Sequence, residues 1–220
     1  MVIRVLVVDD EALIRTGFRH ILEAADDIET VDAVCGGQAM QAVRDLRPDV
    51  VLLDIRMPDV DGLTILSEIR RMAQPPAVAM LTTFDTDEYV VAALRLGAAG
   101  FLLKDTDPEQ LPHLVRSLAA DGVVLSSAVT RTVVEGYLGS GADPDAANVV
   151  ARLTQRERDV LELIAEGLSN AGVGLRLHLS TGTVKDHVSA ILNKTRVTSR
   201  VQAALLAERA GLLRRSREAQ

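Results

Sequence analysis

The chain is 220 residues long, with 48% hydrophobic and 25% charged residues and a formal net charge of −7. This composition is globular and excludes a disordered chain, and the length leaves room for one large domain or two ordinary ones. No apolar run approaches the roughly 20 residues that span a bilayer, so we expect a cytoplasmic protein without a membrane partner. A single cysteine, Cys35, excludes an internal disulfide and a cysteine-based metal cluster.

The charge is divided unevenly along the chain. Residues 1–149 contain 12 Lys and Arg against 24 Asp and Glu, a net charge of −12, whereas residues 150–220 contain 12 against 7, a net charge of +5. This asymmetry indicates an acidic module followed by a basic one. A basic C-terminal module favours a polyanionic partner, although composition alone does not identify it as nucleic acid.

Short apolar runs alternate with amphipathic stretches over the first 120 residues. The strands predicted from these runs are 3–8, 30–34, 50–53, 77–81 and 100–103. Helical periodicity between them predicts, among others, a helix over 11–24 with one apolar face formed by Leu13, Phe18, Ile21 and Leu22. Alternating strands and helices predict an α/β fold with a doubly wound, five-stranded parallel sheet. The four consecutive apolar residues 50–53 are typical of a strand buried on both faces.

Polar side chains follow four of these strands: Asp9 and Asp10, Asp54, Thr82, and Lys104. Because the carboxyl ends of parallel strands meet at one edge of a sheet, we expect these side chains to share a cleft. Three neighbouring carboxylates repel one another unless a cation lies among them, and Mg²⁺ accepts carboxylates together with waters and a phosphate oxygen. With the amine of Lys104 and the hydroxyl of Thr82, such a site suits an incoming phosphoryl group.

Each of these residues also has a purely structural interpretation. Asp9 and Asp10 could cap the helix that begins near Glu11, and Asp54 could start a turn before Pro58. Thr82 could be an ordinary strand residue, and Lys104 could be a solvated strand end. The occurrence of all of them in order at one predicted sheet edge favours a functional site.

The same residues, with their neighbours, resemble the receiver domain of bacterial response regulators over residues 1 to about 120. The motifs that carry the resemblance are Asp9-Asp10, Asp54 followed by Met57-Pro58 and Asp61-Gly62, Thr82, and Phe101 three residues before Lys104. The resemblance implies the strand order 2-1-3-4-5. A departure from the wider receiver pattern is Asp105, which stands where proline commonly follows the lysine.

The resemblance also implies roles for these residues. Asp54 would accept phosphate from a partner sensor histidine kinase, and Lys104 and Thr82 would bind that phosphate. Thr82 and Phe101 would form a switch, in which Phe101 rotates inward behind the threonine. The implied Mg²⁺ ligands are Asp9, Asp10, Asp54 and the backbone carbonyl of Arg56.

The pattern changes after Leu118. Ser126-Ser127 can cap a short helix through Leu138, and residues 139–145 are polar and rich in helix breakers, which predicts a flexible linker. We therefore divide the chain into a first domain over 1–120, a linker with a short helix over 121–150, and a small all-α domain over 151–215.

Capping signals organise the last seventy residues. Thr154 and Glu157 form a predicted capping box at the start of a helix that Gly167 closes. Ser169 and Ser180 cap the next two helices, which are joined by a tight turn and predict a helix-turn-helix. Gly174, which lacks a side chain, should permit a close approach of the two helices. A fourth helix is expected from Ser199.

This region resembles the LuxR-type DNA-binding domain, and its union with a receiver resembles the NarL/FixJ family of transcription regulators. The supporting motifs are Leu153-Thr154-x-Arg156-Glu157, Gly167-Leu168-Ser169-Asn170, and Ser180-x-x-Thr183-Val184-Lys185-x-His187-Val188. The resemblance implies that the helix over 181–194 enters the major groove. The candidate base-reading residues are Lys185, Asp186 and Ser189, and the candidate phosphate contacts are Thr181, Thr183, Lys194 and Arg200.

Two departures from the family pattern lie in this region. Gly172 stands where glutamate is usual, and Gly172 and Gly174 should each cost the short helix about 1 kcal/mol relative to alanine. Thr195-Arg196 replaces the usual Leu-Gly after the recognition helix. We expect the first helix of the motif to be softer than its neighbours.

The leading hypothesis is therefore a response-regulator transcription factor, a switch rather than an enzyme, which dimerises on phosphorylation and binds double-stranded promoter DNA. One alternative is a receiver-like regulator whose DNA binding ignores phosphorylation. Another is an aspartyl-phosphate hydrolase with Asp54 as nucleophile, but Arg56 stands where a second carboxylate would be needed, and the basic region would have no task.

Overall fold

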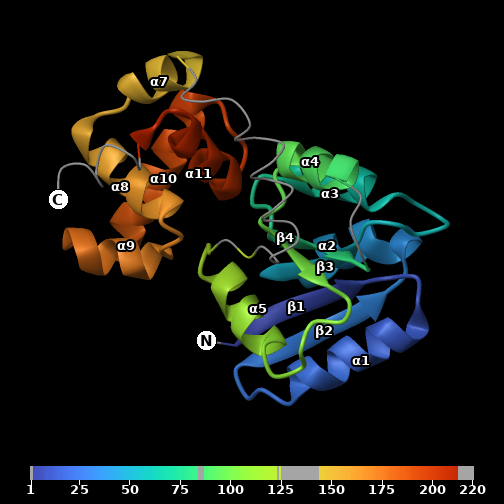
Figure 1. The fold of residues 1–220 in the computed structure, drawn as a ribbon. Helices are drawn as coiled ribbons and strands as arrows, with labels where there is room; N and C mark the ends of the chain where they lie inside the picture. Colours follow the sequence, from blue (N-terminus) through green and yellow to red (C-terminus); the bar gives the residue numbers. More distant parts are fainter. Residues whose placement is uncertain (1, 84–86, 123, 125–143, 213–220) are drawn as a thin grey trace.

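The computed structural model describes residues 2–83, 87–122, 124 and 144–212. It consists of an α/β unit that runs through helix α5 and a helical unit that begins at helix α7 (Figure 1). The helix predicted between Ser126 and Leu138 lies outside the described residues, as does the linker over 139–143. Among the described helices, none is long and apolar enough to cross a bilayer.

The α/β unit contains one parallel sheet in the order β2-β1-β3-β4-β5, so the predicted topology is confirmed. Its strands are β1 (Ile3–Val8), β2 (Ile28–Val34), β3 (Val50–Asp54), β4 (Ala77–Thr82) and β5 (Gly100–Leu103). All five predicted strands are present. β2 begins two residues earlier than expected, and β3 and β4 each extend by one residue, to Asp54 and Thr82.

Helices cover both faces of the sheet, as alternating strands and helices require. They are α1 (Ala12–Glu23), α2 (Ala39–Leu46, after a 3-10 turn at Gly36–Gln38), α3 (Gly62–Arg70), α4 (Asp87–Leu96) and α5 (Leu111–Ala119). Residues of α1 and α5 pack on one face, and residues of α2, α3 and α4 pack on the other (Figure 1).

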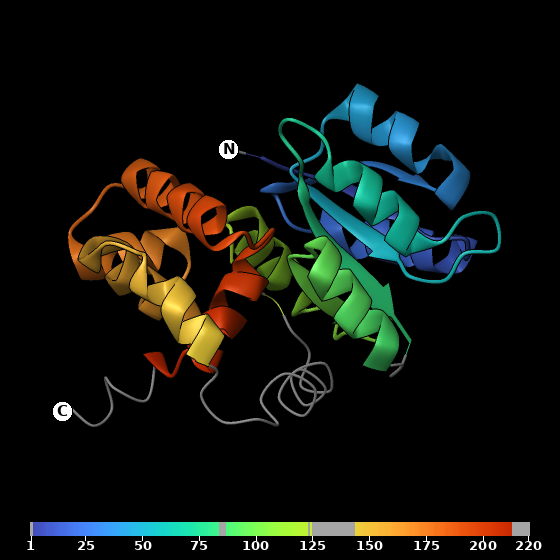
Figure 2. The ribbon, with the colours of Figure 1, turned by 90° about the horizontal axis from the view of Figure 1, so that it is seen from above.

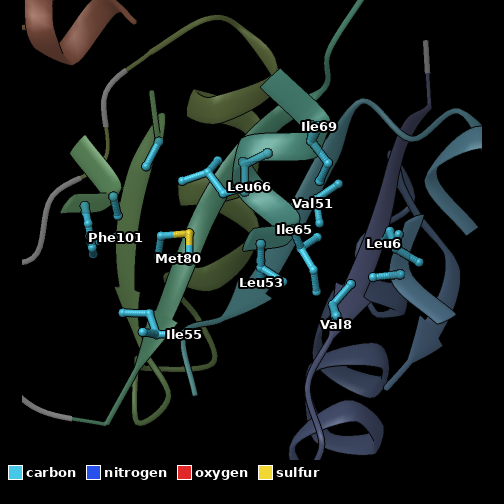
Figure 3. Close-up of a cluster of buried hydrophobic side chains, with 14 of the residues drawn as sticks. Leu6, Val8, Val51, Leu53, Ile55, Ile65, Leu66, Ile69, Met80 and Phe101 are labelled. Carbon is cyan, nitrogen blue, oxygen red and sulfur yellow. The ribbon is translucent and has the colours of Figure 1, made fainter. Parts of the chain in front are cut away.

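Strand β3 is buried on both faces, as predicted. Val51 and Leu53 join the core layer under α2, α3 and α4 (Figure 3), whereas Val50 and Leu52 join the layer under α1 and α5. All four side chains have no exposed surface. Because each such burial contributes roughly 1.5–3 kcal/mol, this strand is firmly anchored, and so is the carboxylate at its end.

One predicted apolar face is wrong in part. Phe18 and Leu22 of α1 are buried, but Leu13 is 83% exposed. With about 3.6 residues per helical turn, Leu13 lies roughly half a turn around the helix from Leu22, so both cannot face the sheet.

The helical unit contains α7 (Pro144–Ala151), α8 (Gln155–Ala165), α9 (Asn170–Leu177), α10 (Thr181–Thr195) and α11 (Arg200–Arg209). The predicted capping box of Thr154 and Glu157 is present. Ser169, Ser180 and Ser199 each accept a hydrogen bond from the backbone N–H three residues later, which begins α9, α10 and α11.

Two local features differ from expectation. Pro144 and Asp145 were assigned to the linker, but they begin α7; proline suits a first helical position because its missing N–H would have no intrahelical partner there. Gly174 does permit a close approach, yet to the turn rather than to another helix. A Cβ at Gly174 would lie 2.7 Å from the carbonyl oxygen of Leu179.

The helical unit is docked on the α/β unit through α11 and the segment before it (Figure 2). The Gln202 side chain donates to the carbonyl oxygens of Leu94 and Arg95 at 2.6 and 2.8 Å, and Arg70 donates to the carbonyl of Thr198 at 2.8 Å. Val201 is 1% exposed and belongs to the hydrophobic cluster of the sheet. The start of α11 is therefore packed like a part of the α/β core.

Candidate functional site

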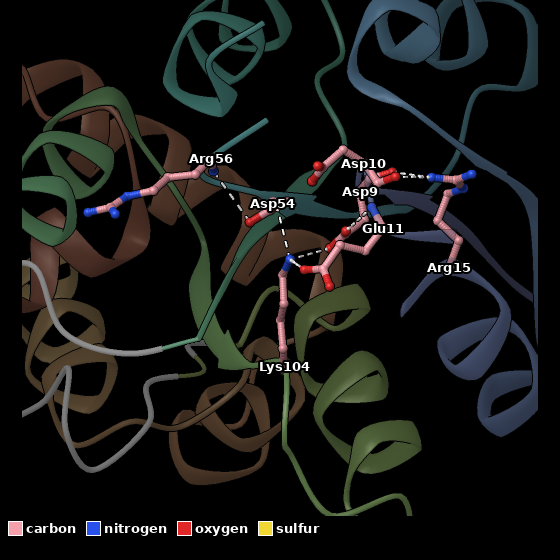
Figure 4. Close-up of polar contacts among 7 residues, drawn as sticks. All are labelled: Asp9, Asp10, Glu11, Arg15, Asp54, Arg56 and Lys104. Atoms are coloured by element: carbon pink, nitrogen blue, oxygen red, sulfur yellow. Dashed lines mark hydrogen bonds and ion pairs between the residues drawn. The ribbon is translucent and has the colours of Figure 1, made fainter. Parts of the chain in front are cut away.

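The polar residues that follow the strands do meet at one edge of the sheet (Figure 4). Asp54 is the last residue of β3, Asp9 and Asp10 follow β1, and Lys104 follows β5. One carboxylate oxygen from each of the three aspartates lies within 4.8 Å of the others. The predicted juxtaposition of residues far apart in the sequence is confirmed.

Lys104 is the central cation of this site. Its Nζ lies 3.1 Å from Asp54 Oδ2, 3.0 Å from Asp9 Oδ2 and 2.9 Å from Glu11 Oε1. Burial alone would lower the pKa of Lys104, but hydrogen bonds with the three carboxylates outweigh burial and raise that pKa above its ordinary value. The amine is therefore firmly protonated.

Asp54 is 4% exposed, and burial raises its pKa. The hydrogen bond from Lys104 opposes this rise, the charge of Asp9 adds to it, and the backbone N–H of Arg56, 3.4 Å from Asp54 Oδ1, opposes it weakly. The pKa of Asp54 remains above the ordinary value, so a further cation would favour its ionised, nucleophilic form.

The donor set around Asp54 fits a hard divalent cation. Asp9, Asp10 and Asp54 offer only carboxylate oxygens, the ligands that Mg²⁺ prefers. The carboxylate of Asp9 is fully buried, whereas Asp10 is exposed. This geometry suits an ion held by protein oxygens on one side and by waters or a phosphate on the other.

Asp54 also borders a pocket of about 210 Å³, which is large enough to admit a phosphoryl group. Arg56, Thr82 and Lys104 line the same pocket. The predicted phosphate-binding residues thus surround the space next to the predicted acceptor. The Arg56 guanidinium also lies over the Tyr89 ring, 5.0 Å from its centroid.

The Asp61-Gly62 pair fixes the loop that follows Asp54. Asp61 caps α3 by accepting from the N–H of Leu63 at 2.9 Å. Gly62 donates to the carbonyl of Ile55 at 3.0 Å, and a Cβ there would lie 2.1 Å from the carbonyl oxygen of Asp54. Only glycine fits this contact, which explains why it follows the capping aspartate.

Two contributors were missed by the sequence reasoning. Glu11 accepts from Lys104 and lines the pocket, and Arg15 donates to the backbone carbonyls of Asp9 and Asp10 at 2.7 and 2.9 Å. Glu11 was interpreted only as a helix start. Its position directly after two aspartates at a strand end was the available signal.

Both proposed switch residues, Thr82 and Phe101, lie among the described residues. Phe101 is fully buried in this structure, so its inward position is observed and a rotation is not. Thr82 ends β4 and lines the pocket.

Helix α10 exposes most of the side chains that the resemblance implies as DNA contacts. Lys185, Asp186 and Ser189 are exposed, as are Thr181 and Thr183 at the start of the helix. The opposite face packs inward: Val184 and Ile191 are buried, and Val188 and Leu192 are partly buried. Helix α10 therefore has one exposed polar face and one apolar face that packs inward.

Two predicted phosphate contacts and one base-reading residue have partners within the protein. Arg200, a predicted DNA-phosphate contact, is 8% exposed here and donates to Asn170 Oδ1 and to the carbonyl of Leu168. Lys194 binds both carboxylate oxygens of Glu157 at 2.7 and 2.8 Å. Lys185 is exposed but forms an ion pair with Asp121 at 3.2 Å.

Comparison with known families matches both units. Residues 5–116 match the response regulator receiver domain, and residues 151–207 match the luxR family of bacterial regulatory proteins. The receiver match by itself spans half of the chain.

Relatives and solved structures give the same result over nearly the whole length. The nitrate/nitrite response regulator protein NarL of Escherichia coli K12 is 38% identical over 202 residues, covering 91% of this chain and 93% of NarL. The transcriptional regulatory protein LiaR of Bacillus subtilis is 35% identical over 208 residues, covering 94% and 97%. The crystal structure of response regulator ChrA, from a heme-sensing two-component system, aligns with a TM-score of 0.53 at 32% identity, covering 96% and 98%. With its sheet-edge carboxylates and its helix-turn-helix, the chain belongs to the NarL-type response regulators, in which a receiver domain precedes a LuxR-type DNA-binding domain.

Proposed function

We propose that Asp54 accepts a phosphoryl group from a sensor histidine kinase and that this event controls promoter binding by α10. The observation that carries the proposal is the position of the Asp54 carboxylate, at the end of a rigid buried strand, beside the Lys104 amine and two further aspartates. These groups supply a nucleophile, a cation and a metal-binding donor set in one pocket.

In the transfer step, a carboxylate oxygen of Asp54 attacks the phosphorus of a phosphohistidine, the P–N bond breaks, and an acyl phosphate forms. Mg²⁺ held by Asp9, Asp10, Asp54 and the carbonyl of Arg56 would supply neutralisation of the phosphoryl charge. Lys104 exchanges its contact with Asp54 Oδ2 for a phosphoryl oxygen, and the Thr82 hydroxyl donates to another.

The output depends on how the helical unit is docked. Ser189 and Leu192 of α10 line the cleft against the α/β unit, and Lys185 is tied to Asp121. This arrangement competes with insertion of α10 into a major groove. Phosphorylation shifts the equilibrium away from the docked form, and the released protein binds two DNA half-sites as a homodimer in the cytoplasm.

The test compares the response of promoter affinity to a phosphodonor in two variants. Acetyl phosphate with Mg²⁺ should tighten DNA binding by the wild-type protein in a mobility-shift titration, and chelation of the metal should abolish the response. Asp54→Asn should not respond, whereas Asp26→Asn, which removes an exposed carboxylate elsewhere, should respond like wild type.

An equal response of Asp54→Asn would refute the proposed acceptor. Wild-type DNA binding that is unaffected by the donor, despite a phosphorylated Asp54 in the mass spectrum, would favour DNA binding that is independent of phosphorylation.

A further inference from the structure

A cleft of about 270 Å³ lies between the two docked units, away from Asp54. It is bordered by the start of β4, whereas Asp54 belongs to the opposite edge of the sheet, where the strands end. Its charged lining residues, among those that the structure describes, are Arg70, Lys185 and Arg200 against the single carboxylate of Asp121. The cleft is therefore cationic in an otherwise acidic protein.

Arg200 borders this cleft without a described carboxylate in direct contact with its guanidinium. It is 8% exposed, and its two terminal nitrogens donate to neutral acceptors, Asn170 Oδ1 and the carbonyl of Leu168. Its Nε–H is buried and meets no acceptor among the described residues. Burial lowers the pKa of Arg200 to about 10, which reflects how poorly the surroundings compensate its charge.

Arg70, at the end of α3, borders the cleft from the α/β unit and likewise has only a neutral hydrogen-bond partner among the described residues. Its terminal nitrogen donates to the neutral carbonyl of Thr198 at 2.8 Å, and its Nε–H is also buried without a described acceptor. The carboxylate of Asp121 contacts neither guanidinium, since it accepts from Asn170 Nδ2 at 2.8 Å and from Lys185 at 3.2 Å. One buried guanidinium, of Arg200, and one half-buried guanidinium, of Arg70, thus border the same cavity, and neither contacts an anion among the described residues.

We propose that this interdomain cleft binds a small tetrahedral oxyanion, inorganic phosphate or a phosphomonoester, through Arg70, Arg200 and Lys185. Such an anion offers several acceptor oxygens to donors that approach from different directions, and guanidinium groups match oxyanions well. Because the donors come from both units, the anion stabilises the docked arrangement and, on the proposed function, opposes DNA binding by α10.

The binding claim is tested on the unphosphorylated full-length protein without DNA. Isothermal titration with inorganic phosphate, in EDTA and at an ionic strength held constant with chloride, should show one saturable site. A parallel titration with glycerol phosphate distinguishes the two sources: equal or tighter binding assigns the site to phosphomonoesters, and weaker binding assigns it to the free ion.

Matched variants locate the site. Arg70→Gln should weaken phosphate binding by about tenfold or more, because a hydrogen bond to a charged group is lost. Arg71→Gln, which removes the adjacent exposed arginine, should bind like wild type. Asp121→Asn removes the competing negative charge but keeps an acceptor for Asn170, so it should bind phosphate more tightly.

The proposal is overturned if phosphate shows no saturable binding, if Arg70→Gln binds like wild type, if Arg71→Gln loses as much affinity, or if Asp121→Asn does not bind more tightly. The effect on DNA binding is measured separately. Promoter affinity should be lower in phosphate than in chloride at the same ionic strength. Absence of that loss with intact phosphate binding overturns only the antagonism of DNA binding, and it leaves the role of Asp54 to its own test.

Discussion

Gln202→Glu should open the docked arrangement of the unphosphorylated protein. In the structure the Gln202 amide nitrogen donates to the carbonyls of Leu94 and Arg95 in the last turn of α4, and its Oε1 accepts from the N–H of Thr198 at 2.9 Å. Glutamate keeps the acceptor for Thr198 but has no N–H to donate. It also places a negative charge against carbonyls at a helix C-terminus, where the helix dipole is negative.

The magnitude follows from these contacts. Two lost hydrogen bonds cost about 1 kcal/mol each, and the unfavourable dipole adds about 0.3–1 kcal/mol. The docked form should therefore lose about 2–3 kcal/mol relative to the open form, a shift of roughly 30- to 150-fold in their ratio. Because apparent affinity scales with the fraction of competent protein, promoter affinity should rise without a phosphodonor, by up to roughly 30- to 150-fold if the docked form dominates in the wild-type protein.

Mobility-shift titration measures the affinity, and small-angle X-ray scattering measures the expected increase in radius of gyration. Gln155→Glu is the matched control, because it makes the same charge change at an exposed position in the same unit. The reasoning fails if Gln202→Glu leaves both quantities at the wild-type values, or if Gln155→Glu changes them equally.

Two further predictions concern stability. Leu66→Ala, at a fully buried position, should lower the free energy of unfolding of the α/β unit, measured in urea, by about 2–5 kcal/mol. Leu13→Ala, at a position that is 83% exposed, should change that free energy by less than about 0.5 kcal/mol, and equal losses in the two variants would contradict the assigned core. For Glu157, burial alone would raise the pKa, but hydrogen bonds from Lys194 and Thr154 outweigh burial and lower it. The charged form therefore stabilises the helical unit above the ordinary glutamate pKa of about 4.3, and this contribution disappears as pH falls through the lower folded pKa. Glu157→Gln should thus be less stable by about 1–2 kcal/mol at neutral pH, with the difference from wild type shrinking below about pH 4 in thermal unfolding; a constant difference would contradict this assignment.

The fold and the centre of the site were predictable because they depend on local patterns. The four apolar residues 50–53 indicated a strand buried on both faces, and the parallel sheet then dictated that Asp54, Asp9 and Lys104 would meet. Capping signals located the helices of the second unit for the same reason, since Ser169 and Ser180 act on N–H groups three residues away.

The contacts that the sequence did not predict are those in which a side chain has several possible partners and the local sequence does not determine which one it takes. Arg200 follows a capping serine, and its position alone allowed either a DNA phosphate or an internal acceptor; Asn170, thirty residues earlier in the sequence, supplies the internal acceptor. Glu11 is consistent with a helix start in the sequence, and only the fold brings the Lys104 amine within hydrogen-bond distance of its carboxylate.

The docking of the two units was unpredictable for a further reason. In the sequence Gln202 is an ordinary helix residue. Its side-chain amide nitrogen reaches the carbonyl oxygens of Leu94 and Arg95 only because α4 ends next to α11. Helix α11 is apolar around much of its surface: Ala203 and Ala207 pack within the helical unit, whereas Val201 packs against the sheet unit. A helix with two buried faces fits a protein with two domain arrangements, because the Val201 face must find a new cover when the units separate. In the proposed mechanism, separation of the two units would expose the Val201 face, and burial of that face against a second copy of the chain would couple release to dimerisation.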